Sequence, residues 1–371
     1  MRLVLALLLV SGVGTLLPAQ SLLIVDDDGG AGVYTDIAPA LVAAVAGDVI
    51  LVRPGSYNAF IVDKGVRVLA DAGAIVQGDG TGRSMVVQRL PAGQSAVVRG
   101  LVVDPATPGE VELTDNNGLV HVEAAVVPLP MRIVRCTQVA LHFVTLEGAP
   151  ALEIVDSTVA AAQCRFDGKS GGNGMTVAGS SSRVSFAGGS VQGASGSNLG
   201  AALYLDSGDV FFGGADTIVA AGASWSGSGP PTPAIASIAG NLTIDPVVYL
   251  APSGGANAIE GGANYRFLSV PSTRAGVTNG VLTATVHGTP GFAVVLVGGG
   301  PLTPSLPSPF RDLWVDPFSI GLYAGSIGID GTVSTTVPLP PQAHGTVAAL
   351  QALVLWNDQF LLSTPVLLTI D

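Results

Sequence analysis

The feature that most constrains the fold is a repeat of short apolar segments separated by glycine, serine and aspartate. Residues 133–137 (IVRCT) align with residues 154–158 (IVDST), and residues 144–148 (VTLEG) align with residues 164–168 (CRFDG). Segments this short do not form stable hairpin sheets, but stacked coil on coil they bury one continuous interior. The repeat therefore predicts a parallel β-helix with coils of about 20 to 31 residues.

We expect an all-β protein in which a right-handed parallel β-helix of about nine coils occupies residues 48–265. A sandwich of hairpins is the competing interpretation. That fold requires two-residue Asn-Gly or Asp-Gly turns between longer strands. Such turns are few in this part of the chain, so the sequence favours the β-helix.

A lead-in segment and a capping helix are predicted over residues 20–47. Asp36 is a suitable N-cap, Pro39 falls in the first turn, and Gly47 would end the helix. Ile37, Leu41, Val42 and Val45 recur at helical spacing and are expected to share its buried face.

The segment from residue 34 to residue 57 (YTDI…GD…PGSY) resembles the N-terminal cap of secreted pectate-lyase-like β-helix proteins. The resemblance implies that a short helix closes the first coil. It implies no activity, because this cap carries no catalytic residues.

The apolar segments become longer after residue 268. Longer apolar strands appear at residues 281–286, 292–297 and 350–356, and Asp330-Gly331 is a strong hairpin turn. A C-terminal β-sandwich is therefore expected over residues 268–371, as an independent module. This segment resembles the C-terminal β-module of secreted bacterial β-helix proteins of unassigned function.

Residues 1–19 have the form of a Sec-type signal peptide. Arg2 precedes a short apolar run, and Leu17-Pro18-Ala19 provides a small-residue cleavage site. No later apolar run is long enough for a transmembrane helix. The mature chain is thus expected to be secreted or held at the cell surface, and its oligomeric state is left open.

Charge limits the partners. The chain has 15 basic and 27 acidic residues, a net charge of −12, so nucleic acid is excluded as an expected partner. The only cysteines, Cys136 and Cys164, fall on different strands of adjacent coils in the repeat alignment. They are therefore expected to remain unpaired.

Extra residues in the repeat suggest a wall of loops. Insertions are expected at residues 104–118, 168–174, 194–200 and 223–233, all at one vertex of the coil, while residues 148–150 leave a notch. Loops on a rigid scaffold commonly carry binding sites. The alternative is that extra residues accumulate wherever the coil tolerates them.

Oxygen-bearing side chains gather near this notch and suit the hydroxyl groups of a glycan. The expected carbohydrate-binding residues are Asp104, Glu110, Glu112, Asp115, Asn116, Glu147, Asp167 and Trp225. Glu110, Glu112 and Asp115 are also candidate Ca²⁺ ligands, although their spacing matches no known calcium loop. No other cofactor is expected. A solvated acidic loop without a ligand is the alternative interpretation.

Signatures of catalysis are absent. The paired-carboxylate, Gly-His-Gly and Arg-Ile-Lys motifs of β-helix polygalacturonases do not occur in the coils, and Arg165 is the one candidate for the base of a lyase. The sequence therefore favours a non-catalytic protein that binds extracellular polysaccharide or forms part of the cell surface. A polysaccharide lyase or glycoside hydrolase with a divergent site, and a structural or adhesive rod, are the alternatives.

Overall fold

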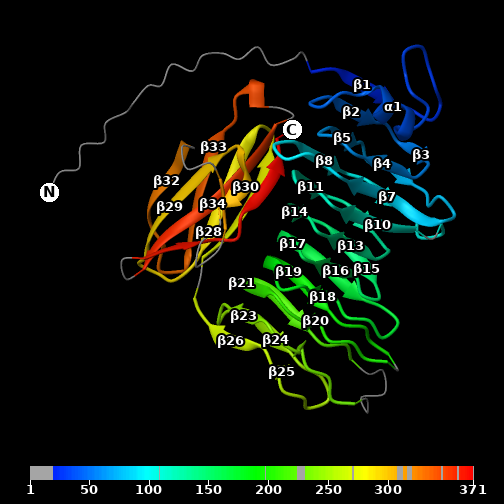
Figure 1. The fold of residues 1–371 in the computed structure, drawn as a ribbon. Helices are drawn as coiled ribbons and strands as arrows, with labels where there is room; N and C mark the ends of the chain where they lie inside the picture. Colours follow the sequence, from blue (N-terminus) through cyan, green and yellow to red (C-terminus); the bar gives the residue numbers. More distant parts are fainter. Residues whose placement is uncertain are drawn as a thin grey trace, which may run out of the picture.

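The computed structural model describes residues 20–107, 109–196, 198–223, 230–269, 271–306, 312–315, 320–343, 346–356 and 359–370. The predicted signal peptide, residues 1–19, lies outside them. The described chain forms a parallel β-helix, and a set of antiparallel sheets packs along one side of it (Figure 1). None of the described helices is long and apolar enough to cross a bilayer.

Three columns of parallel strands build the β-helix. The first column, which we call the tail-facing sheet, contains β1 (Leu22–Val25), β2 (Val49–Val52), β5 (Arg67–Ala70), β8 (Ser95–Arg99), β11 (Leu119–Glu123), β14 (Gln138–His142), β17 (Thr158–Gly168), β19 (Arg183–Gln192), β21 (Asp209–Ala220), β23 (Asn241–Ile244) and β26 (Asn264–Phe267). The second column contains β3 (Gly55–Tyr57), β6 (Ala74–Val76), β9 (Val102–Val103), β12 (Val126–Val127), β15 (Thr145–Gly148), the second halves of β17, β19 and β21, and β24 (Tyr249–Ala251).

The third column has nine strands, one for each coil. They are β4 (Phe60–Val62), β7 (Gly82–Gln88), β10 (Gly109–Thr114), β13 (Met131–Val134), β16 (Leu152–Val155), β18 (Met175–Ala178), β20 (Leu203–Leu205), β22 (Ile235–Ser237) and β25 (Ile259–Gly261). The predicted parallel β-helix of about nine coils is confirmed.

The register predicted from the repeat is also confirmed. Ile133 pairs with Ile154 between β13 and β16, and Leu146 pairs with Phe166 between β15 and β17. Alternate side chains point inward and form one continuous buried core. Cys136 and Cys164 are both buried and free, as the register required.

Aromatic rings stack inside the coils. Phe166, Phe186 and Phe212 lie on three successive coils and are fully buried. Their ring centroids are 5.6 Å and 5.8 Å apart in edge-to-face arrangements. Each ring therefore fills the space between its neighbours at a favourable aromatic geometry.

The capping helix is shorter than predicted. It spans α1 (Ile37–Ala43), and the side chain of Asp36 accepts a hydrogen bond from the Ile37 amide as the expected N-cap. The chain leaves the helix at Ala44, which is extended. Val42 and Val45 were expected on the buried face, but both are exposed. Ile37, Ala40 and Leu41 are the residues that close the first coil.

The C-terminal segment, which we call the tail, is antiparallel. One sheet contains β27 (Ser272–Thr278), β28 (Val281–His287) and β33 (Thr332–Pro338). Another contains β29 (Ala293–Gly299), β32 (Ile320–Ser326), β34 (Val347–Trp356), β35 (Gln359–Leu362) and β36 (Val366–Thr369). A short pair, β30 (Pro301–Leu306) with β31 (Leu313–Val315), completes it. Apolar residues of both larger sheets form one buried cluster, as a β-sandwich requires.

The tail packs directly on the outer surface of the tail-facing sheet. Ala140 and Ala160 point outward from β14 and β17, yet they are buried against Trp314 and Leu367 of the tail. Small side chains at these outward positions let the two layers approach closely. The tail covers the middle coils in this way and leaves the last coils of the same sheet uncovered (Figure 1).

Candidate functional site

The predicted acidic loop at residues 104–118 is wrong in its central part. Residues 109–114 form strand β10, which pairs with β7 and β13. Val111 and Leu113 point into the core and are fully buried, while Glu110 and Glu112 alternate with them on the outside. The period-2 pattern of this segment therefore indicated a strand. That strand separates Asp104 at one vertex of the coil from Asp115 at the next.

The acidic side chains of this segment already have partners. Glu112 lies 3.4 Å from the Arg83 guanidinium, and Asp115 forms an ion pair of 2.6 Å with Arg135. Hydrogen bonding to Arg135 lowers the pKa of Asp115 below its ordinary value. Glu110 is exposed beside Arg83 in the strand register. Glu112 and Asp115 are thus held in outward ion pairs, and the three carboxylates do not surround a common centre.

Asn116 has a structural position. It is fully buried. Its side-chain oxygen accepts a hydrogen bond from the Leu90 amide, and its amide donates to the carbonyl oxygen of Val87 and approaches the sulfur of Cys136. These contacts hold neighbouring coils together and leave no part of the side chain facing solvent.

The notch at residues 148–150 is closed by the loop that follows β17. The Lys169 amide donates to the carbonyl oxygen of Gly148. A Cβ on Gly172 would lie 2.4 Å from the Cα of Ala149, so the two backbones are in direct contact. The notch is therefore filled by the chain itself.

The charged residues beside the notch are brought together, but they pair with one another. Arg165 donates to Asp167 at 2.8 Å, and Lys169 lies 3.4 Å from Glu147. Hydrogen bonding to Asp167 raises the pKa of Arg165 above its ordinary value. A guanidinium held in its charged form is poorly suited to accept a proton, so this geometry does not favour Arg165 as a lyase base.

The remaining candidates are Trp225 and the expected Ca²⁺ ligands. Trp225 lies outside the described residues. Among the described residues, the acidic or metal-ligating side chains that converge within 4.8 Å are Asp26, Asp27 and Asp28. The side chain of Asp27 accepts a hydrogen bond from the Ser56 amide. Glu110, Glu112 and Asp115 do not form such a group.

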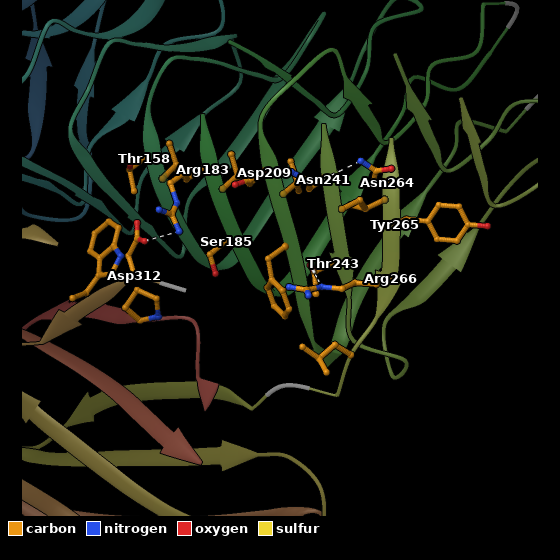
Figure 2. A pocket seen from close by; sticks show the side chains of 18 residues that line it. Thr158, Arg183, Ser185, Asp209, Asn241, Thr243, Asn264, Tyr265, Arg266 and Asp312 are labelled. Carbon is orange, nitrogen blue, oxygen red and sulfur yellow. Dashed lines mark hydrogen bonds and ion pairs between the residues drawn. The ribbon is translucent and has the colours of Figure 1, made fainter. Parts of the chain in front are cut away.

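A groove lies between the edge of the tail and the last coils of the β-helix. The sequence analysis did not identify it. It encloses about 370 Å³. Its floor is the outer surface of β17, β19, β21, β23 and β26, and one wall comes from Asp312, Trp314 and Pro365 of the tail (Figure 2). Ligands commonly bind in concave sites of this size between two parts of a chain.

Two rows of side chains run along the floor, one residue from each coil. The first row is Thr158, Arg183, Asp209, Asn241 and Asn264. The second row is Ser185, Phe211, Thr243 and Arg266. Neighbours within a row are separated by the spacing of stacked strands, about 4.8 Å. The groove thus offers a regular series of hydrogen-bonding groups along the axis of the β-helix.

Hydrogen bonds orient the first row. The Asn241 amide donates to Asp209 at 2.8 Å, and the Asn264 amide donates to the side-chain oxygen of Asn241 at 3.4 Å. Both asparagines are exposed. Each keeps part of its amide free of these contacts, which leaves hydrogen-bonding capacity for a ligand in the groove.

The two ends of the groove differ in charge. At the tail end, Arg183 forms an ion pair of 2.9 Å with Asp312. Burial raises the pKa of Asp312 above its ordinary value, opposed by Arg183 and reinforced by nearby Asp209. At the open end, Arg266 donates to the Thr243 hydroxyl. Figure 2 shows Tyr265 at this open end, away from Asp312; its side chain is 58% exposed.

Comparison with known proteins gives a distant structural likeness. The chain is similar to the enzymatically active domain of tailspike protein 2 of bacteriophage CBA120, with 11% sequence identity and a TM-score of 0.32. The likeness covers 88% of this chain and 68% of that chain. No protein-family model and no curated protein matches. The assignment to the parallel β-helix fold rests on the strand pairing itself.

Proposed function

We propose that this protein is a secreted or cell-surface glycan-binding β-helix protein, and that the groove between the tail and the last coils is its binding site. The observation that carries the proposal is the two rows of side chains, one residue from each coil, in which every member except Phe211 is polar or charged. Sugars present hydroxyl groups at a regular repeat along an extended chain, and carboxylate and amide side chains are good partners for them. We favour this groove over the site expected near the notch, because the charged side chains there pair with one another.

One apolar side chain of the floor supports the same ligand class. Phe211 interrupts the second row with an apolar ring, which also contacts Leu361 of the tail. A surface that alternates polar and apolar groups suits a sugar, which has hydroxyl edges and C–H faces.

The test is binding of the mature chain to a glycan array, followed by calorimetry with each glycan that binds. The double substitution Asn241→Ala and Asn264→Ala removes two amides from the floor. We expect it to weaken binding at least tenfold, since each lost hydrogen bond is worth about 1 kcal/mol. Gln192→Ala, which removes an amide from the second column of strands, is the matched control and should bind normally. Full binding by the double variant would contradict this site.

A glycoside hydrolase is the second candidate function, favoured by one observation. Two carboxylates line the groove, and burial raises the pKa of Asp312 while Asp209 remains exposed. Inverting glycosidases use two carboxyl groups, one of which has a raised pKa. If the groove is catalytic, incubation with a bound glycan should release new reducing ends, and both Asp312→Asn and Asp209→Asn should abolish the release. Binding without release supports the non-catalytic function.

A further inference from the structure

Arg266 is unusual among the basic residues of this chain. Most of the basic side chains that the structure describes lie within 4.0 Å of a carboxylate, as Arg132 does with Glu153 and Arg274 with Asp216. Arg266 instead donates a hydrogen bond to a neutral hydroxyl group, that of Thr243. Its guanidinium is exposed in the groove. A guanidinium has five N–H donors, so most of them remain available to a ligand.

The carboxylates of the groove lie toward the other end. Asp209 and Asp312 are on the tail side, where Arg183 pairs with Asp312 (Figure 2). Asp209 is on β21, and its register partners in the next two coils are Asn241 and Asn264. The strand that carries Arg266 is thus two coils away from Asp209, a rise of about 10 Å along the axis.

We propose that the groove binds a glycan in which acidic sugars are isolated among neutral ones, and that Arg266 binds the acidic group. This inference rests on the proposed glycan-binding function. An anion at Arg266 gains charge-assisted hydrogen bonds, which are about twice as strong as neutral ones. A second anion two sugar units along the chain would face Asp209, and like charges at close range oppose binding. A neutral sugar at that position avoids this repulsion and can donate hydroxyl hydrogen bonds to Asp209, while Asn241 lies on the coil between the two positions.

The experiment uses an array printed with hexasaccharides in three forms over one set of linkages: neutral, carrying a single uronic acid, and carrying a uronic acid on every unit. The protein is the mature chain. We expect the singly acidic form to bind about tenfold more tightly than the neutral form of the same linkage. Its affinity should fall as the salt concentration rises, because an ion pair at an exposed site is screened.

Three variants test which charged side chains determine the preference for acidic glycans. Arg266→Ala should abolish the difference in affinity between the singly acidic form and the neutral form of the same linkage. Asp209→Asn should raise the affinity of the uniformly acidic form. Arg132→Ala removes an exposed arginine from the third column of strands, and it should change none of these affinities.

The outcomes separate the two proposals. If no form binds, the glycan-binding function itself fails. If the neutral form binds and the singly acidic form binds no better, or if Arg266→Ala keeps the preference for acid, this inference is overturned while the binding function stands. If the uniformly acidic form binds the wild-type protein most tightly, the isolated arrangement of acidic sugars is wrong.

Discussion

Replacing Phe186 by alanine is expected to lower the free energy of unfolding by about 3 to 5 kcal/mol, the usual cost of removing a buried phenylalanine. The ring is fully buried in the fourth coil from the end of the β-helix. It makes edge-to-face contacts with Phe166 on one side and Phe212 on the other. The substitution therefore removes two aromatic contacts as well as the buried area. Urea titration followed by far-UV circular dichroism measures the change.

The control is Tyr249→Ala, which removes a ring from the outer surface, where the side chain is 63% exposed. Surface changes of this kind usually alter stability by less than about 0.5 kcal/mol. A loss below about 1 kcal/mol for Phe186→Ala would show that neighbouring coils close over the cavity. That result would contradict a rigid, close-packed interior.

Acid should destabilise the contact between the β-helix and the tail. His121 and Glu123 point outward from β11 but are buried under the tail, where the Thr369 amide donates to Glu123. Burial lowers the pKa of His121 from 6.5 to about 4. Burial alone would raise the pKa of Glu123, but His142, His121 and the Thr369 amide outweigh it and bring the value to about 2. Arg99 also lies 3.9 Å from Glu123.

The lowered pKa values of His121 and Glu123 both make the folded protein less stable as the pH falls. His121 is neutral in the folded protein, so its full contribution to the free energy of unfolding is present above pH 6.5. This contribution is lost as the pH falls toward 4, because the unfolded chain then binds a proton that the folded protein does not. A shift of this size corresponds to about 3 kcal/mol. Glu123 contributes above pH 4.5 and loses its contribution as the pH falls further. We therefore expect the free energy of unfolding to decrease steadily below pH 6.5.

Urea titrations at pH 7.5, 6 and 5 measure this dependence. His121→Leu replaces the imidazole with an apolar side chain of similar size and should remove most of the slope between pH 6.5 and 5. His287→Leu is the comparison variant: burial also lowers the pKa of this half-buried histidine, so its removal should reduce the slope less than His121→Leu does. An unchanged slope in His121→Leu would mean that other groups govern the acid sensitivity.

The carboxylate and histidines in this interface were visible in the sequence but could not be interpreted there. His121, Glu123 and His142 lie on outward positions of their strands, which in a free β-helix face solvent. They are buried only because the tail packs over them. The alanines at the outward positions 140 and 160 were the available signal, since a solvated strand surface rarely carries such side chains in succession.

The sequence by itself determined the coils. Pairing between neighbouring coils depends on short-range alternation, so the alignment of residues 133–137 with 154–158 predicted the observed register directly. The N-cap at Asp36 and the unpaired cysteines followed from equally local rules. The segment that forms β10 was predicted to be a loop because it is rich in charged residues. Its period-2 alternation of apolar and charged residues is that of a strand.

The tertiary structure alone decided where the groove lies. Its floor comes from five coils, but its wall comes from Asp312, Trp314 and Pro365 of the tail, far along the chain. Repeat periodicity carries no information about which surface of the β-helix the tail covers. The same docking buries the middle coils and leaves the last ones open, so it converts two ordinary rows of polar side chains into a lined groove. That choice depends on the packing of one layer against another, which no local pattern in the sequence specifies.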